Sequence, residues 1–352
     1  MADQSDLCKV LFLDVGHGSS TVICFPGKGE GVVIDSPDAP TTIRALRQEG
    51  INRLRLVLVT HSDHDHVAGV ASIVRSFQGQ IDWVLYHPDR RRVVDSQEAF
   101  WQLVGAVKER RIRSGPADSD HGDFIEMSAG RCAILYPKYE DVVRNLKAGG
   151  TPNRASAAFF FEIENHAFLL CGDLEGDGWS HLRDASGLPK VSVFLFPHHG
   201  GEFQLKSYVP DARAGRGRAK RQPCVTQGEL LEVMAPETVV ISSGTAENKK
   251  YPPKAKVLRM IKDFGGSRAG FRSMCTQLTR RCDPNPAAHR SSALQHLSAV
   301  NVPRISVPRN TDCPCAGTVV IRIDRSRNLT IAPSSKVHRE IIGALAHPAC
   351  VT

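Results

Sequence analysis

Three histidines and two aspartates stand within six consecutive residues of this chain, in the stretch His61-Ser62-Asp63-His64-Asp65-His66. Imidazole and carboxylate groups are ligands of divalent metals such as zinc, manganese and iron. The apolar run at residues 57–59 precedes the stretch and is typical of a buried strand. A turn after a buried strand ordinarily uses Gly, Asn or Pro, so alternating His and Asp indicates a metal site rather than a solvated turn.

Further candidate ligands follow three apolar runs later in the chain. These are Gly172-Asp173 after residues 167–171, His198-His199-Gly200 after 192–196, and Ser242-Ser243-Gly244 after 238–241, with Asn248 and Tyr251 beyond. Taken singly, a Gly-Asp pair is usually a turn, and a His pair is sometimes structural. In layered α/β proteins, however, strand ends on one edge form a single crevice. The ordered set therefore predicts that distant segments converge on one site.

Short strands alternate with helical patterns along the chain. Strands are predicted at residues 9–14, 20–24, 31–35, 54–60, 83–87, 132–136, 157–164, 167–171, 192–196, 238–242 and 318–324. Helices are predicted at residues 40–48, 70–77, 98–109, 178–184, 228–233 and 254–263. This mixture predicts a layered α/β fold. The first three strands follow one another like hairpins, which favours mixed sheets over purely parallel ones.

The composition allows a large core and an anionic partner. The 352 residues are 41% apolar and carry a net charge of +8. This charge favours nucleic acid, a phosphate ester or a membrane surface as the partner. No apolar stretch approaches the ~20 residues of a membrane span, and the acidic, polar residues 1–6 do not resemble an export signal. We therefore expect a cytoplasmic protein without a membrane span.

Together these elements resemble a metallo-β-lactamase-fold hydrolase of the ComEC-like branch, named for the hydrolase domain of competence proteins. The residues that carry the resemblance are Leu13-Asp14-Val15-Gly16-His17-Gly18-Ser19, Ile34-Asp35, Thr60 through Gly69, Asn153-Arg154-Ala155-Ser156, Gly172-Asp173 and His198-His199-Gly200. They span roughly residues 7–265. The resemblance implies a fold of the αββα type, a sandwich of two mixed sheets with outer helices.

The resemblance also implies a site for two divalent ions and no organic cofactor. Its metal ligands are expected to be His61, Asp63, Asp65, His66, Asp173, His198 and His199. Asp173 would bridge the ions, and His198 would complete the second site with His199 in reserve. The commonest form of this fold has His at the position of Asp63, and a carboxylate there leaves both Zn(II) and Mn(II) open. The usual third histidine of the first ion is not evident, and Asn153 or His87 are alternatives.

Two such ions activate a shared water for in-line attack, so the resemblance implies a hydrolase with Asp65 and Asp173 as catalytic residues. A phosphodiester substrate fits best, because this branch is nuclease-like and the chain is basic. Lactone, thioester or phosphocholine ester hydrolysis would use the same ions. A metal-binding regulatory or defence module with little turnover and an unknown protein partner is a further alternative.

Several residues are candidates for substrate contact. They are Asn153, Asn248 and Tyr251, together with Arg216 and Arg218 of the basic segment 212–222. Arginines in such a segment can track a nucleic-acid backbone through its phosphates. A flexible, solvated insertion without a partner is an equal alternative.

We expect a hydrolase domain at residues 1–268 and a C-terminal extension at 269–352, whose cysteine-containing strands pack on the same domain. Cys275 and Cys282 precede a segment, 283–311, that is rich in Pro, Ser, Asn and Arg and is expected to be irregular. Cys313-Pro314-Cys315 follows it. The four cysteines could form a structural zinc clip, although their spacings differ from the common zinc knuckle. Buried or free thiols are the alternative.

Overall fold

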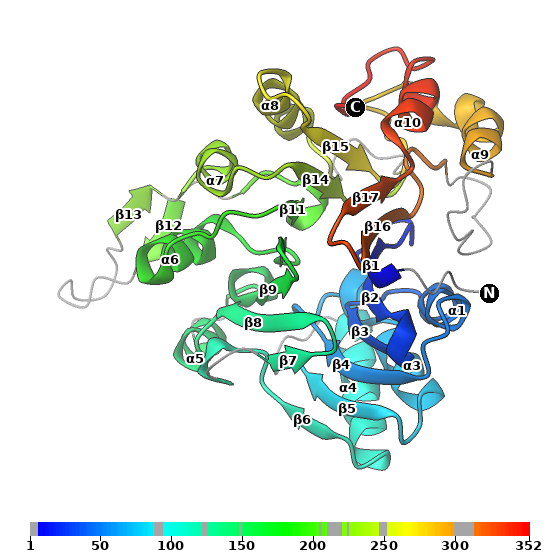
Figure 1. The fold of residues 1–352 in the computed structure, drawn as a ribbon. Coiled ribbons are helices and arrows are strands. Elements are labelled where there is room, and N and C mark those ends of the chain that lie inside the picture. Colours follow the sequence, from blue (N-terminus) through cyan, green and yellow to red (C-terminus); the bar gives the residue numbers. More distant parts are fainter. Residues whose placement is uncertain are drawn as a thin grey trace.

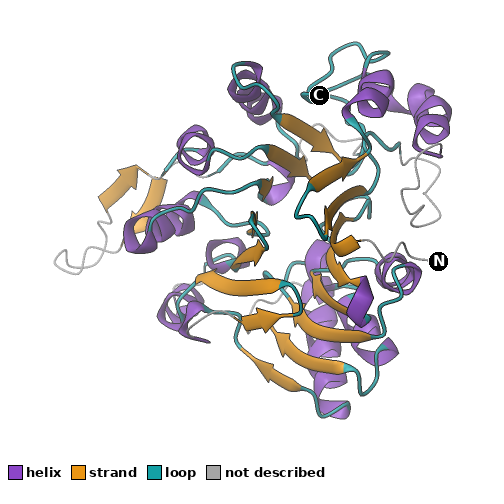
Figure 2. Cartoon of the chain, viewed as in Figure 1, coloured by secondary structure: helices purple, strands orange, loops and turns teal. Residues whose placement is uncertain are grey.

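The structure, a computed structural model, describes residues 6–87, 94–121, 125–147, 150–203, 206–209, 220–223, 225–245, 252–298 and 313–352. Two mixed β-sheets pack face to face, and helices cover their outer faces (Figures 1 and 2). The predicted fold class, an αββα sandwich, is therefore confirmed.

The first sheet has eight strands in the order β17-β16-β1-β2-β3-β4-β5-β6. Their bounds are β1 Asp6–Phe12, β2 Thr21–Phe25, β3 Glu30–Ile34, β4 Arg53–Leu58, β5 Ile81–Leu85, β6 Arg113–Gly115, β16 Val319–Asp324 and β17 Leu329–Ala332. Strands β3 to β6 pair in parallel, whereas β17, β16, β1, β2 and β3 pair in antiparallel fashion. The hairpin-like start of the chain thus produces the mixed sheet that was expected.

The second sheet has seven strands in the order β15-β14-β11-β10-β9-β8-β7. Their bounds are β7 Ile125–Met127, β8 Gly130–Tyr136, β9 Ala158–Ile163, β10 His166–Leu170, β11 Val193–Leu195, β14 Thr238–Ile241 and β15 Arg272–Cys275. Strands β10, β11, β14 and β15 are parallel neighbours. A separate two-stranded sheet joins β12 (Lys206–Val209) to β13 (Lys220–Pro223).

The helices are α1 Ala39–Gln48, α2 His64–Val67, α3 Val70–Ser76, α4 Val94–Glu109, α5 Tyr139–Lys147, α6 Gly176–Ser186, α7 Gln227–Met234, α8 Ala255–Gly266, α9 Arg290–Ser298 and α10 Ser335–Ile342. Helices α1, α3 and α4 pack on the first sheet, with Leu46 and Leu103 in the shared core. Helices α6, α7 and α8 pack on the second sheet around Trp179. None of the described helices combines the length and the apolar character that crossing a membrane requires.

Strand β9 shows why the strands of the sandwich are apolar on both faces. Phe159 and Phe161 point into the core between the two sheets. Phe160 points the other way, into the core between the second sheet and its helices. A strand buried on both faces is a continuous apolar run rather than an alternating one. The run of three phenylalanines is therefore the pattern that a central strand of this sandwich requires.

The C-terminal residues complete both sheets. β16 pairs with β1 along its length, and β15 forms one edge of the second sheet. The expectation of an irregular segment at 283–311 is wrong for the part that the structure describes, because helix α9 lies there. This helix buries only Ala293 and Leu297, against Ile341. Two apolar contacts in nine residues are too sparse to produce a helical pattern in the sequence.

The basic segment 212–222 falls mostly outside the described residues, as do Arg216 and Arg218.

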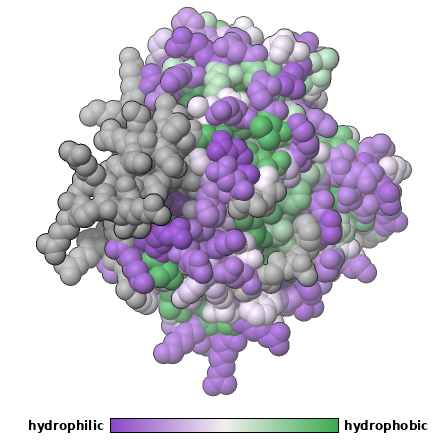
Figure 3. Space-filling view, turned by 90° about the vertical axis from the view of Figure 1, so that its left-hand side faces the viewer, coloured by the Kyte–Doolittle hydropathy of each residue, from purple (hydrophilic) through white to green (hydrophobic). Residues whose placement is uncertain are grey.

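On the face of the molecule beside α6, hydrophilic side chains cover most of the described surface, and smaller apolar groups lie between them (Figure 3).

Replacement of Gly18 by alanine should destabilise the fold. Gly18 has a φ of +127°, and a Cβ there would lie 2.4 Å from the Asp65 carbonyl oxygen and 2.8 Å from Pro37 Cγ. The neighbouring Ser19 N–H donates to the same carbonyl at 3.1 Å, so the turn cannot retreat without losing this bond. We expect the free energy of unfolding in denaturant to fall by an amount on the order of 3 kcal/mol.

Gly105→Ala is the matched control. Gly105 lies inside α4, and a Cβ there would meet no described atom within 4 Å. Alanine should raise stability at this position by about 0.5–1 kcal/mol, because glycine has the greater conformational freedom to lose in a helix. Equal effects of the two substitutions would contradict the close approach at Gly18.

Candidate metal centre

The loop after β4 carries four of the expected ligands, and the short helix α2 orients them. α2 begins at His64, with Asp63 at its N-cap position. His61 and His66 are buried, Asp63 and Asp65 are half-buried, and His64 is exposed. Successive residues on a helix point about 100° apart, so His64 can face solvent while residues beside it face inward.

Two neighbouring parallel strands of the second sheet position the other expected ligands. Asp173 follows β10 by way of Gly172, and His198 and His199 follow β11. Parallel strands end at the same edge of a sheet, which brings the two loops together. The His198 N–H donates to the Gly172 carbonyl at 3.0 Å, so a backbone hydrogen bond fixes their relative position.

The Asp173 carboxylate lies between two pairs of imidazoles. Its Oδ1 is 3.2 Å from His66 Nε2 and 3.5 Å from His199 Nε2. Its Oδ2 is 3.9 Å from both His61 Nε2 and His198 Nε2. One buried carboxylate therefore presents a different oxygen to each side of the centre.

Each of the two half-buried aspartates lies on a different side of the centre. Asp65 Oδ2 lies 3.4 Å from His199 Nε2, and Asp63 Oδ2 lies 3.4 Å from His61 Nε2. The ligand atoms of Asp65, His66 and His199 are all within 4.8 Å of one another. Those of His61, His66 and Asp173 meet the same limit. The centre thus offers two overlapping sets of nitrogen and oxygen ligands.

Hydrogen bonds outside the centre turn ring lone pairs towards it. His66 Nδ1 donates to Asp35 Oδ2 at 2.7 Å, and His199 Nδ1 donates to the Ser242 carbonyl at 2.9 Å. A neutral imidazole carries one N–H, so each Nε2 is then an acceptor. These two Nε2 atoms are only 3.2 Å apart. Their lone pairs and the nearby carboxylates fit a shared cation, as in metal sites whose histidines donate outward.

Asp35 and Thr60 extend this support to His61. The Thr60 N–H and Oγ1 donate to the two oxygens of Asp35, at 2.8 and 2.7 Å. Thr60 Oγ1 can then accept from His61 Nδ1, 3.0 Å away. The Nε2 of His61 is buried and has no hydrogen-bond partner among the described residues. An unsatisfied buried nitrogen that points at Asp173 is the kind of atom a metal ion satisfies.

The charges in the centre stabilise one another. Burial raises the pKa of a carboxyl group, yet the pKa of Asp173 is held well below its usual range by His199 and His66. Burial opposes the charged form of His66 as well, but the Asp173 and Asp35 carboxylates raise its pKa. At His198 burial outweighs the charge of Asp173, and the pKa is lowered. His198 therefore interacts less strongly with Asp173 than His66 and His199 do.

The two adjacent histidines differ in position. We expected His198 to complete the second site and His199 to stand in reserve. In the structure His199 is 3% exposed and contacts Asp65, His66 and Asp173, whereas the His198 side chain is 31% exposed and contacts only Asp173 of these. Both residues have positive φ, 53° and 51°, within a 3-10 turn (His198–Gly200), and this tight turn separates their side chains.

The remaining candidates are Asn153, His87, Asn248 and Tyr251. Asn153 sits in a 3-10 turn (Pro152–Ala155), and its carbonyl accepts from the Glu175 N–H at 3.4 Å. His87 is buried, and burial lowers its pKa to about 3, so the ring is neutral near pH 7. Asn248 and Tyr251 are not among the residues that the structure describes.

His17 is a member of the centre that the sequence analysis did not single out. Its Nε2 lies 3.2 Å from Asp65 Oδ2, and its ring centroid is 5.1 Å from that of His199. Its side chain is 41% exposed, so it stands between the centre and solvent. The available signal was a histidine between two glycines in the turn that follows the first strand. That turn lies at the same edge of the sandwich as the centre.

The sequence profile of the Metallo-beta-lactamase superfamily matches residues 13–202, which contain all the histidines and aspartates of this centre. The chain therefore belongs to the metallo-β-lactamase superfamily of hydrolases, whose members bind divalent metals. The resemblance drawn from the sequence is confirmed.

ComE operon protein 3 of Bacillus subtilis (strain 168) is 22% identical over 276 residues, which are 72% of this chain. The chain spans 30% of that relative's length. A hydroxyacylglutathione hydrolase of Rhodopseudomonas palustris (strain BisB5) is 31% identical over 234 residues, 59% of this chain and 90% of the relative. Among solved structures, Igni18, a metallo hydrolase from Ignicoccus hospitalis, covers 74% of this chain and 91% of its own at 14% identity and a TM-score of 0.41.

Replacement of Asp35 by asparagine should weaken metal binding without unfolding the chain. Asparagine keeps the size of Asp35 and tolerates its φ of 55°. It removes the carboxylate that fixes His66, and loss of such an outer partner typically lowers metal affinity roughly 10–100-fold. Competition with a chelator of known affinity measures the change. Asp184→Asn, at an exposed position, is the control, and an unchanged affinity in Asp35→Asn would contradict this role.

Proposed function

We propose that this chain is a two-metal phosphodiesterase whose substrate is a nucleic acid or a related phosphodiester. The observation that carries the proposal is the Asp173 carboxylate, which faces His66 and His199 with one oxygen and His61 and His198 with the other. A carboxylate with two such faces is suited to bridging two cations. This arrangement supports catalytic ions rather than one structural ion.

The ligands divide between the two ions by distance. His61, Asp63, Asp173 Oδ2 and His198 would hold the first ion, and Asp65, His66, His199 and Asp173 Oδ1 would hold the second. His198 then supplies the histidine that the first ion otherwise lacks. Three carboxylates in this set keep manganese as well as zinc open as the metal.

When bound, two such ions lower the pKa of a shared water and neutralise charge that develops on a phosphoryl oxygen. In the proposed reaction, water adds to phosphorus, one ester bond breaks, and the leaving oxygen takes a proton. His17 is exposed and contacts Asp65, so it can pass that proton between the centre and solvent. The hydrogen bonds of Asp35 to His66 and Thr60 keep the ligand rings oriented throughout.

Two features favour a phosphodiester over a neutral substrate. Asp63 stands where the commonest form of the fold has histidine, and an additional carboxylate favours the harder ions that bind phosphate oxygens. The chain also carries a net charge of +8, which attracts polyanions. Arg216 and Arg218 remain candidates for phosphate contact, together with Asn153, Asn248 and Tyr251.

Hydrolysis of a small ester or thioester is the second candidate. It is favoured by the relative named hydroxyacylglutathione hydrolase, which is 31% identical and matches over 90% of its own length. The same ion pair would polarise an acyl carbonyl in place of a phosphoryl group. A substrate panel therefore needs both chemical classes.

Asp173→Asn should abolish hydrolysis by the metal-loaded chain. The amide keeps the shape but removes the bridging charge, and we expect a loss of roughly 10³-fold or more in kcat/KM. Initial rates with zinc and with manganese should be measured on single-stranded DNA, RNA, a bis-aryl phosphodiester and an acyl-glutathione thioester. His64→Ala, which removes an exposed imidazole from α2 beside the centre, should keep its rate.

The panel also discriminates between the candidates. Turnover of only the thioester would replace the phosphodiesterase proposal by the second candidate. No turnover of any substrate with both ions bound would favour a regulatory module.

His199→Ala and His198→Ala should differ in their metal content. His199 is buried between Asp65 and His66, so its loss should release the second ion on dialysis. His198 stands at the rim beside Asp173 alone, so its loss should weaken the first ion and leave the second in place. Metal content per chain, measured by mass spectrometry after dialysis, reports both effects. Retention of both ions by His199→Ala would refute the assignment of ligands.

A further inference from the structure

A second group of metal-ligand side chains lies in the C-terminal part of the chain and shares no residue with the metal centre. Its members come from four separate segments and are all buried. We name it the cysteine cluster: Cys275 at the end of β15, Cys315 in the loop before β16, His338 in α10, and Cys350 near the C-terminus.

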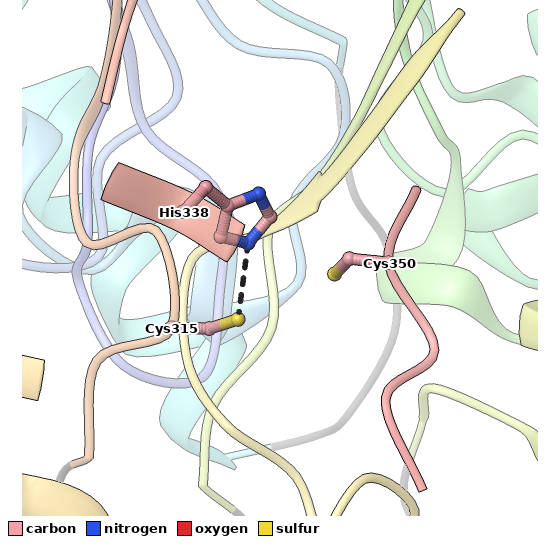
Figure 4. Close-up of side chains that lie close together, drawn as sticks. All are labelled: Cys315, His338 and Cys350. Carbon is pink, nitrogen blue, oxygen red and sulfur yellow. Dashed lines mark hydrogen bonds between the residues drawn. The ribbon is translucent and has the colours of Figure 1, made fainter. Parts of the chain in front are cut away.

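The ligand atoms of the cluster converge on one point. Cys315 Sγ is 3.4 Å from His338 Nε2, and these two atoms and the Cys350 Sγ all lie within 4.8 Å of one another (Figure 4). Cys275 is a neighbour of this group, because its thiol interacts electrostatically with that of Cys350. Two sulfurs and one ring nitrogen therefore surround a common centre, and the sulfur of Cys275 lies near enough to be the fourth ligand that we propose.

The separation of Cys315 Sγ and His338 Nε2 matches an edge of a tetrahedral zinc site. With Zn–S bonds of about 2.3 Å and a Zn–N bond of about 2.0 Å, ligand atoms lie about 3.8 Å apart between sulfurs and about 3.5 Å apart between sulfur and nitrogen. The observed 3.4 Å between Cys315 and His338 is close to the second edge. Zinc bound by three cysteines and one histidine is a common structural combination.

The environment of the cluster also suits a cation. His338 is fully buried, and its Nε2 faces the sulfur of Cys315. The cysteines are buried as well, so thiolates that bind a metal here would be shielded from water. A buried thiolate is costly unless a positive charge compensates it. A zinc ion would supply that charge.

We propose that the cysteine cluster binds a structural zinc ion, distinct from the ions of the hydrolytic centre. This ligand set differs from the clip expected from the sequence. Cys313 lies outside it, with its thiol 2.9 Å from the Pro286 carbonyl, to which it donates. Cys282 lies beside the cluster, with its sulfur 3.7 Å from Thr279 Oγ1. His338 and Cys350 take the places that these two were expected to fill.

The ion would join the two halves of the sandwich. Cys275 belongs to the edge strand of the second sheet, and Cys315 leads into β16 of the first sheet. The chain end is already attached to the same edge, because Val351 and Ser273 form two hydrogen bonds of 2.9 Å. A metal bond at Cys350 would add a further link to these backbone contacts.

Metal content of the full chain tests the proposal. Asp173→Asn should lose metal from the hydrolytic centre yet retain one equivalent of zinc. Adding Cys350→Ser to that variant should remove the remaining zinc and lower Tm. Cys313→Ser, which removes a buried thiol outside the cluster, is the matched control and should retain the zinc. Zinc content unchanged by Cys350→Ser would overturn the proposal.

A second measurement holds even if Cys350→Ser does not fold. The unmutated chain produced with cobalt should show the sulfur-to-cobalt charge-transfer absorption of a tetrahedral thiolate site, which nitrogen and oxygen ligands do not give. Absence of that absorption from a cobalt-loaded chain would overturn the proposal. So would a disulfide within the cluster, found by alkylating and weighing the denatured chain.

Discussion

The buried carboxylate of Asp173 is the constraint around which this fold is organised. A carboxylate taken out of water is stable only among compensating charges or hydrogen-bond donors. Here four imidazole nitrogens approach it from two sheets, and each oxygen faces its own pair. The edge of the sandwich must hold these rings with their lone pairs inward, because rings free to rotate would not favour a cation at one point.

The scaffold meets this demand with hydrogen bonds that lie outside the centre. Asp35 is the clearest case, since it accepts from Thr60 and His66 and so orients two ligand rings, one of them through Thr60. Its own backbone is in the left-handed region, with a φ of 55°. Such a conformation is unfavourable for a non-glycine residue and persists where the surroundings determine it. The core between the sheets provides that rigidity.

The sequence was sufficient for the architecture and for most of the side chains that the fold brings together at the centre, and its limits have physical causes. Long β-branched and aromatic runs identify strands well, and a dense His and Asp loop after such a run has few structural explanations. The pair His198-His199 could not be resolved, because a tight turn with two positive φ values decides which ring faces inward. Sequence spacing carries no record of that choice.

The sequence did not predict the ligand set of the cysteine cluster, for a different reason. Its ligands are 40, 23 and 12 residues apart along the chain and come from a strand, a loop, a helix and the chain end. The close spacing of Cys313 and Cys315 suggested a pair, because residues two apart on an extended strand face the same side. The chain bends at residues 315–316, however, and Cys313 contacts the Pro286 carbonyl instead. Only the folded chain brings His338 of α10 and Cys350 of the chain end within 4.8 Å of Cys315.

Different ligand chemistry gives the two proposed metal sites different tasks. Thiolates bind zinc firmly and select against manganese, so the cysteine cluster would keep its ion under conditions in which a site of carboxylates and imidazoles exchanges. Exchange at the hydrolytic centre would leave the C-terminal link intact, because no ligand is shared. Under the two proposals, the catalytic metal would change with supply while the sheets that position Asp173 remain joined.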